Sequence, residues 1–220
     1  MSIEAQKYFQ DNDYVVIRNF VDENTAFLFY RYVINKVKKV NFKLQYAKED
    51  FRPEWDGAFG DGQINRSYYC YGDVLMDTLL ESGLTMMNDF TGLNLVPTYS
   101  YYRLYEYGDV LEKHIDRNSC EISTTLCLGY NTNNVEKNTY PDYKWPMFVE
   151  TKTGETVSID LNPGDMLIYK GCEIPHWREK YIGLNHAQVF LHYNQKDGEF
   201  NNLYDGRPIL GIPKRFTKGD

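Results

Sequence analysis

The run Glu112-Lys113-His114-Ile115-Asp116-Arg117 places a histidine and an aspartate two positions apart, and a second histidine follows much later in Ile174-Pro175-His176. On a strand, residues two apart point to the same face, so His114 and Asp116 can both reach one metal ion. Two imidazoles and one carboxylate fit one face of an Fe(II) octahedron and leave three positions open. The sequence therefore predicts a metal site formed by His114, Asp116 and His176.

The stretch before His176 reads Leu161-Asn162-Pro163-Gly164-Asp165-Met166-Leu167-Ile168-Tyr169. A Pro-Gly-Asp turn that leads into an apolar strand, followed by a polar loop ending in histidine, is how a jelly roll delivers a third ligand. With these motifs the chain resembles the Fe(II)/2-oxoglutarate-dependent oxygenase superfamily, in particular its prolyl-4-hydroxylase-like branch. The resemblance implies a mainly β fold with N-terminal helices, built on a double-stranded β-helix (jelly roll).

Composition limits the class of protein. The chain has 220 residues, enough for one domain with a substantial core, and 42% of them are hydrophobic. No apolar run approaches the ~20 residues of a membrane span, and the N-terminus lacks the pattern of a signal peptide. Four cysteines without C-x-x-C spacing suggest reduced thiols and a cytoplasmic location. The formal charge of −7 argues against a broad nucleic-acid-binding surface.

The expected organisation is a single domain over residues 1–220, with a helical buttress at 1–93 and a β-helix core at 95–195. Apolar spacing predicts helices over 23–40, capped by Asp22, and over 73–90, ended by Gly92. A short strand is expected at 14–20, and further strands at 95–105, 121–130, 147–150, 156–161, 166–170 and 187–193.

Residues 44–70 are rich in glycine, proline and polar side chains, which predicts a loop. Long loops in compact domains are often functional. We interpret the segment 50–72 as a lid, because its glycines permit motion and its aromatic side chains could close over a substrate. A simple surface excursion explains the same composition equally well.

The resemblance implies a 2-oxoglutarate site near the metal. The family pattern has a tyrosine about nine residues before the first histidine, which assigns Tyr105 to the cosubstrate. It also has an arginine or lysine about ten residues after the second histidine, but here that position is His186. Arg178 is another possible cation, and Thr125, on a strand expected to border the site, could contact the cosubstrate.

The resulting hypothesis is an Fe(II)- and 2-oxoglutarate-dependent dioxygenase that uses O₂ to hydroxylate an unactivated C–H bond. Its substrate would be a peptidyl proline or an amino-acid-like molecule, and its oligomeric state stays open. One alternative is a cupin-type metal enzyme that does not use 2-oxoglutarate, favoured by the missing arginine or lysine and disfavoured by the absence of a His-x-His cluster. The other is a non-catalytic jelly-roll binding module, although an intact metal triad argues against it.

Overall fold

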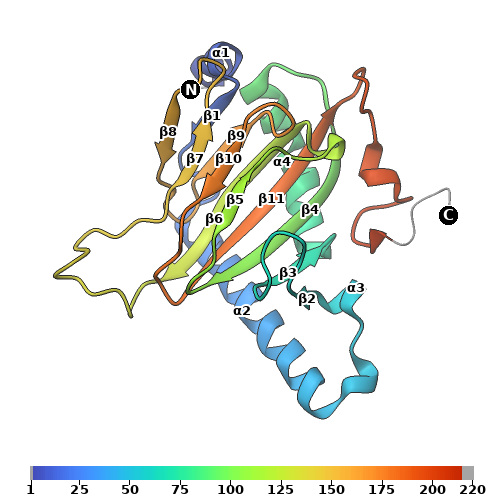
Figure 1. Cartoon of the computed structure of the whole chain (residues 1–220). Coiled ribbons are helices and arrows are strands. Elements are labelled where there is room, and N and C mark those ends of the chain that lie inside the picture. The colour runs from blue at the N-terminus through green and yellow to red at the C-terminus, as the bar shows by residue number, and fades with distance from the viewer. Residues whose placement is uncertain (1, 215–220) are drawn as a thin grey trace.

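Two antiparallel sheets form the centre of the molecule in a computed structural model that describes residues 2–214. The sheets pack face to face, as Figure 1 shows, with side chains of both in one buried cluster. The larger sheet has the order β1 (Tyr14–Ile17), β9 (Met166–Tyr169), β6 (Ile122–Asn131), β11 (Asn185–Gln195), β4 (Leu95–Glu106), β3 (Tyr68–Tyr71) and β2 (Ala58–Phe59). The smaller sheet has the order β5 (Leu111–His114), β10 (His176–Arg178), β7 (Met147–Glu150) and β8 (Thr156–Ile159). This is the expected mainly β jelly roll.

Three helices cover the outer face of the larger sheet (Figure 1): α1 (Ser2–Asn12), α2 (Glu23–Tyr46) and α4 (Val74–Thr91). The Asp22 side chain accepts a hydrogen bond from the Thr25 amide and starts α2, and Asp73 starts α4 in the same way. Gly92 ends α4 with a φ of 72°, a conformation that glycine adopts without strain. The two predicted helices and their caps are confirmed, whereas α1 was not expected.

The segment 44–70 is more structured than its composition predicts. Helix α2 runs on to Tyr46, and the 3₁₀ helix η1 (Lys48–Asp50), the helix α3 (Pro53–Asp56) and the strands β2 and β3 follow. Strand β3 pairs with β4, so this segment extends the larger sheet, as β1 does at its other edge. The N-terminal region therefore supplies three strands of the larger sheet as well as the helices.

Strands β5 and β10 are absent from the ranges predicted above, although a metal-bearing strand at His114 is expected there. Both strands are short. They pair with each other, and this pairing places His176 directly opposite His114. Two further 3₁₀ helices, η2 (Asn118–Cys120) and η3 (Leu203–Gly206), lie outside the sheets. Within residues 2–214, no helix is both long enough and apolar enough to span a membrane.

Candidate metal centre

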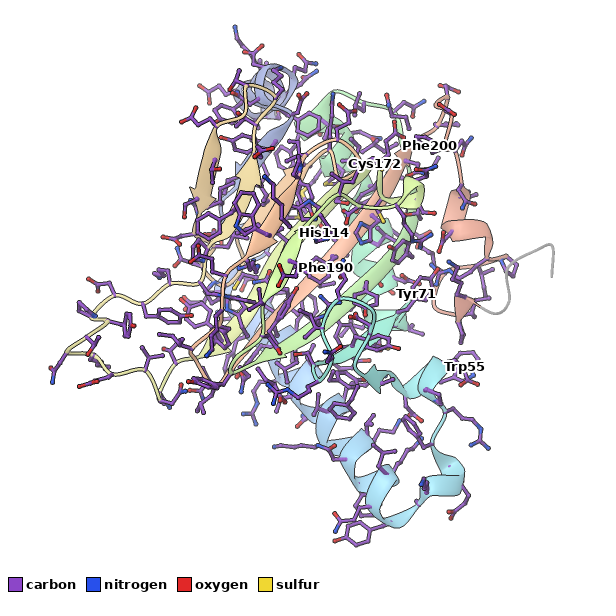
Figure 2. All side chains as sticks on the ribbon, viewed as in Figure 1. Trp55, Tyr71, His114, Cys172, Phe190 and Phe200 are labelled. Carbon is purple, nitrogen blue, oxygen red and sulfur yellow. The ribbon has the colours of Figure 1, made fainter. Side chains whose placement is uncertain are left out.

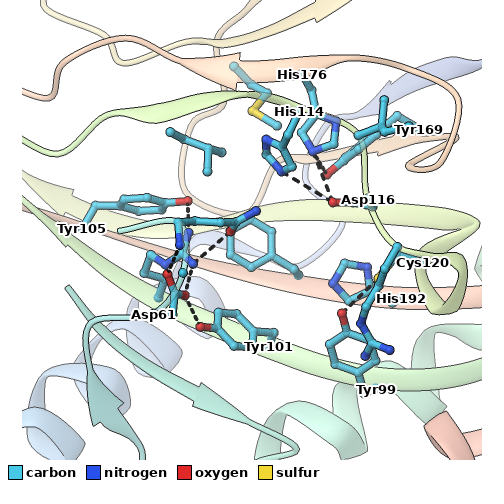
Figure 3. Close-up of a pocket in the computed structure, with 18 residues that line it drawn as sticks. Asp61, Tyr99, Tyr101, Tyr105, His114, Asp116, Cys120, Tyr169, His176 and His192 are labelled. Atoms are coloured by element: carbon cyan, nitrogen blue, oxygen red, sulfur yellow. Dashed lines mark hydrogen bonds and ion pairs between the residues drawn. The ribbon is translucent and has the colours of Figure 1, made fainter. Parts of the chain in front are cut away.

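The three predicted metal ligands meet between the two sheets (Figure 3). Asp116 Oδ1 lies 3.6 Å from His114 Nε2 and 3.5 Å from His176 Nε2. Where nitrogen and oxygen ligands lie at about 2.1 Å from a divalent ion, donors on adjacent octahedral positions are about 3 Å apart. The three side chains therefore surround a space that one such ion can fill.

Backbone carbonyls fix the tautomer of both rings. His114 Nδ1 lies 2.7 Å from the Glu112 carbonyl oxygen, and His176 Nδ1 lies 2.9 Å from that of Ile174. A carbonyl oxygen can only accept a hydrogen bond, so each Nδ1 carries the proton and each Nε2 keeps its lone pair. This outer hydrogen bond is the usual support of a metal-binding histidine.

Asp116 reaches the site by another route than the predicted one. Strand β5 ends at His114, so Asp116 lies in the loop beyond it rather than on a shared strand face. The Asp116 amide donates to the Gly171 carbonyl at 2.8 Å, which ties this loop to the turn after β9. The structure brings Asp116 beside both histidines, although strand alternation is not what places it there.

The histidines and the carboxylate shift each other's pKa. Burial alone would raise the pKa of Asp116, but hydrogen bonding and charge from His114 and His176 hold it far below its usual value. Burial would lower the pKa of His114, and Asp116 and the Glu112 carbonyl outweigh that effect and raise it. Asp116 is therefore ionised at neutral pH, which a carboxylate metal ligand requires.

Ser123 and His192 support Asp116 from behind. Ser123 Oγ donates to Asp116 Oδ2 at 2.6 Å and lies 3.0 Å from His192 Nδ1. Burial lowers the pKa of His192 to about 4, so the ring is neutral and its Nδ1–H can donate to the serine. Ser123 was not predicted, although alternation on β6 places it on the same face as Thr125.

Replacing Gly171 with alanine should displace the Asp116 carboxylate. A Cβ at this position would lie 2.5 Å from Asp116 Oδ2 and from the Cys120 carbonyl oxygen, and against Ser123 Oγ. Loss of support for a ligand typically weakens metal binding by about 10–100-fold, and we expect Fe(II) affinity to fall in this range. Gly62→Ala, where a Cβ meets nothing within 4 Å, is the control for an anaerobic Fe(II) titration. Unchanged affinity in Gly171→Ala would show that Asp116 can move without loss.

His192 should make the metal-free protein sensitive to acid. Because the pKa of His192 falls from 6.5 to about 4 on folding, the unfolded chain binds its proton first as pH drops. The contribution of the neutral His192 to the free energy of unfolding is intact above pH 6.5. It decreases below that pH, by about 2 kcal/mol between pH 6.5 and 5. Urea unfolding at both pH values should therefore show a smaller loss of stability in His192→Gln than in the wild type. Equal losses would mean that His192 does not stay neutral on folding.

A cavity of about 340 Å³ opens over the three ligands. Its floor is the inner face of the larger sheet, with Tyr99, Tyr101 and Arg103 from β4, and Phe190 lines it from β11. Figure 2 shows Phe190 and His114 close together over the centre of the sheets. The volume falls in the range of small-molecule sites.

The turn 61–63 borders this cavity and is tied to β4. The Asp61 carboxylate accepts hydrogen bonds from Tyr101 Oη and Arg103 Nη2, and Arg103 is almost fully buried. Of the expected lid, only this turn lines the cavity. Trp55 lies away from His114 in Figure 2 and is 44% exposed, so it does not cover the site.

The structure separates the four residues expected at the cosubstrate. Tyr105 lines the cavity, and its hydroxyl accepts a hydrogen bond from Arg103 Nη1 at 3.1 Å. Thr125 Oγ1 is buried and donates to Gln188 Oε1 at 2.8 Å, outside the cavity lining. His186 is placed opposite Tyr105 on β11, but it also lies outside that lining.

His186 does not provide the positive charge that its position in the sequence suggested. Its Nε2 lies 2.5 Å from the Gln188 amide nitrogen, which can only donate, and its ring packs against Trp145. Burial, with a smaller effect of Arg178, holds the pKa of His186 well below its usual value. The ring is therefore neutral at physiological pH.

Arg178, the other cation expected at the cosubstrate, is also absent from the cavity lining and lies buried behind it. It lies two residues after His176 on β10 and is 1% exposed. Its Nη1 donates to the Trp145 carbonyl oxygen, but Nε and Nη2 have no hydrogen-bond partner. Burial lowers the pKa of Arg178, and Tyr105 and Tyr169, which both line the cavity, are close enough to act on it. A buried guanidinium with two free donors calls for an anion.

No family model matches the sequence, and no curated protein matches it. Solved structures do share the fold. A prolyl-4-hydroxylase from Pseudomonas putida aligns with a TM-score of 0.61 and 13% identity, over 89% of this chain and 99% of its own. A prolyl hydroxylase from Trichoplax adhaerens, solved with a peptide of hypoxia inducible factor, aligns with a TM-score of 0.60 and 16% identity, over 87% and 88%.

The epimerase SnoN from nogalamycin biosynthesis, in complex with Fe³⁺, α-ketoglutarate and nogalamycin RO, is also similar. It aligns with a TM-score of 0.63 and 12% identity, over 98% of this chain and 97% of its own. At such identities the likeness concerns the fold and leaves the reaction open. The chain therefore has the jelly-roll fold of the Fe(II)/2-oxoglutarate-dependent oxygenases, as its His-x-Asp and Pro-Gly-Asp motifs predicted.

Proposed function

We propose that the protein is an Fe(II)- and 2-oxoglutarate-dependent dioxygenase that hydroxylates an unactivated C–H bond. The observation that carries this proposal is the convergence of His114, Asp116 and His176 at the bottom of a cavity. Two neutral imidazoles and one carboxylate on one side of an ion leave its other side open toward that cavity. Metal, cosubstrate and substrate can then meet at one place.

The donor set fits Fe(II). Both Nε2 lone pairs and an ionised Asp116 point at the same space, and their supporting hydrogen bonds are already formed. When bound, the iron would supply activation of O₂ coupled to the oxidative decarboxylation of 2-oxoglutarate to succinate and CO₂. The protein holds the ligands in place, and the buried aromatic walls keep water away from the reacting atoms.

Arg178 is the residue we assign to the far carboxylate of 2-oxoglutarate. Its Nε and Nη2 lie along one edge of the guanidinium, and an edge of this kind binds a carboxylate through two parallel hydrogen bonds. Tyr105 lines the cavity near Arg178 and can provide a further hydroxyl. Arg103 is a weaker candidate, because Asp61 already neutralises it and only its Nε lacks a partner.

The substrate we propose is a peptidyl proline or an amino-acid-like molecule. A small molecule or the side chain of a peptide matches a cavity of this size, and a similar fold binds a peptide in the Trichoplax adhaerens enzyme. Tyr99, Tyr101 and Phe190 offer apolar ring faces to it. Asp61 and Gln63 in the bordering turn, and Arg103 on the floor, offer polar groups.

Anaerobic titration of the Fe(II)-loaded protein with 2-oxoglutarate tests this function against its rivals. Chelation of the iron by the cosubstrate should produce a visible metal-to-ligand charge-transfer band. Tight Fe(II) binding without the band would favour a cupin-type enzyme that does not use 2-oxoglutarate. Failure to bind Fe(II) at all would favour a non-catalytic binding module.

A further inference from the structure

Tyr169 is placed against the atom that would bind the metal. It is the last residue of β9, is 2% exposed and lines the cavity beside His176 and Asp116 (Figure 3). Its ring meets the His176 ring edge-on at 4.7 Å between centroids, and its hydroxyl oxygen lies 3.4 Å from His176 Nε2. In the sequence, Tyr169 is simply the end of the apolar strand that follows the Pro-Gly-Asp turn.

When the His176 ring is neutral, as metal binding requires, this hydroxyl is the donor. The Nδ1–H of that ring is bonded to the Ile174 carbonyl, so its Nε2 can only accept. A metal ion would use the same lone pair, so the Tyr169 hydroxyl would lose its acceptor when the site fills. A buried hydroxyl rarely stays without a partner, and Tyr169 must then find another one.

The protein atoms nearby are already engaged. Asp116 Oδ1 faces both Nε2 atoms and would bind the ion, while Asp116 Oδ2 accepts from Ser123. Ser123 Oγ in turn lies within hydrogen-bonding distance of His192 Nδ1 and the Cys120 carbonyl. Ser123 Oγ is near enough to Tyr169 to share a hydrogen bond with it. The other acceptors open to the Tyr169 hydroxyl are oxygen atoms that the metal itself would carry in its open positions.

We propose that Tyr169 is a positioning residue that donates a hydrogen bond to an oxygen ligand of the bound metal. That ligand would be a water molecule when the metal is alone and the carboxylate of 2-oxoglutarate when the cosubstrate is present. The Tyr169 hydroxyl would orient this oxygen ligand and draw charge from it. The hydrogen bond to 2-oxoglutarate rests on the proposed function. The hydrogen bond to a water ligand requires only that the site binds a metal ion.

Tyr169→Phe tests the proposal, because it removes one oxygen and keeps the ring. We expect the variant to bind Co(II) with an altered visible absorption spectrum, and to bind 2-oxoglutarate about tenfold more weakly in the Fe(II) form. The energy of the charge-transfer band should also move. Tyr193→Phe is the matched control, because Tyr193 is equally buried and donates to the Leu80 carbonyl on the helix side of the sheet.

Wild-type Co(II) and charge-transfer spectra in Tyr169→Phe would overturn the proposal. Complete loss of Co(II) binding would overturn it too, because Tyr169 would then be a ligand rather than a donor to one. If the wild type binds Co(II) but gives no band with 2-oxoglutarate, the cosubstrate assignment fails and the Co(II) spectra still decide the role of Tyr169. If Tyr169→Phe does not fold, Tyr169→Met also lacks the hydroxyl, and the same Co(II) and charge-transfer spectra measured on that variant decide the proposal.

Discussion

Replacing His176 with alanine is expected to abolish Fe(II) binding and turnover while the fold persists. Removing a residue that only supports a ligand typically costs about 10–100-fold in metal affinity, and loss of a ligand itself should cost more. Within the described residues, His192 lies with Asp116 and Cys120 in a second group of potential metal ligands, but its Nδ1 is engaged by Ser123, and His186 lies outside the cavity lining. Anaerobic Fe(II) titration, with circular dichroism to follow the fold, measures both parts of this prediction.

His186→Gln is the matched control for His176→Ala. His186 is an equally buried histidine, but its Nε2 is occupied by Gln188 and it does not face the cavity. We expect this variant to keep its Fe(II) affinity. Full Fe(II) occupancy in His176→Ala would disprove the triad, and a loss in both variants would point to a general disturbance of the core.

The grouping of His114, Asp116 and His176 could be predicted from the sequence because its signal is local. His114 and Asp116 are two residues apart, and the Pro-Gly-Asp turn marks the strand that precedes His176. What the sequence does not contain is the pairing of β10 with β5, which places His176 directly opposite His114. It also hides the early end of β5, since nothing in the chain shows that Asp116 would be held by the Gly171 carbonyl.

The cosubstrate residues were harder to predict because they depend on packing across the two sheets. Counting ten residues from His176 leads to His186, and the structure does pair His186 on β11 with Tyr105 on β4. Counting cannot show that Trp145 and Gln188 enclose this ring and keep it neutral. Nor can it show that Arg178, only two residues after His176, has two donors without a partner. Such information lies in contacts between distant strands.

Replacing Arg178 with methionine is expected to stabilise the metal-free protein and to abolish binding of 2-oxoglutarate. A buried charge without a partner costs free energy, and apolar replacements of buried ions can raise stability by about 1–4 kcal/mol. The variant also loses two hydrogen bonds to the cosubstrate carboxylate, each worth about 1.5–3 kcal/mol, so its affinity for 2-oxoglutarate should fall by about 100-fold or more. Thermal unfolding of the metal-free protein and anaerobic titration of the Fe(II) form measure the two effects.

Arg207→Met separates this explanation from a general effect of removing a buried arginine. Arg207 is also almost fully buried, but it is paired with Asp77 and donates to the Thr98 and Ile212 carbonyls. Its removal leaves the Asp77 carboxylate buried without its charge partner, so we expect a loss of about 3–5 kcal/mol. If the free energy of unfolding rises in Arg178→Met and falls in Arg207→Met, then Arg178 lowers the stability of the metal-free protein and is retained because a ligand needs it. A different outcome would be that Arg178→Met is destabilised like Arg207→Met and still binds 2-oxoglutarate normally. Arg178 would then be part of the core, and the carboxylate would have to be bound elsewhere. Arg103 would be the next residue to replace.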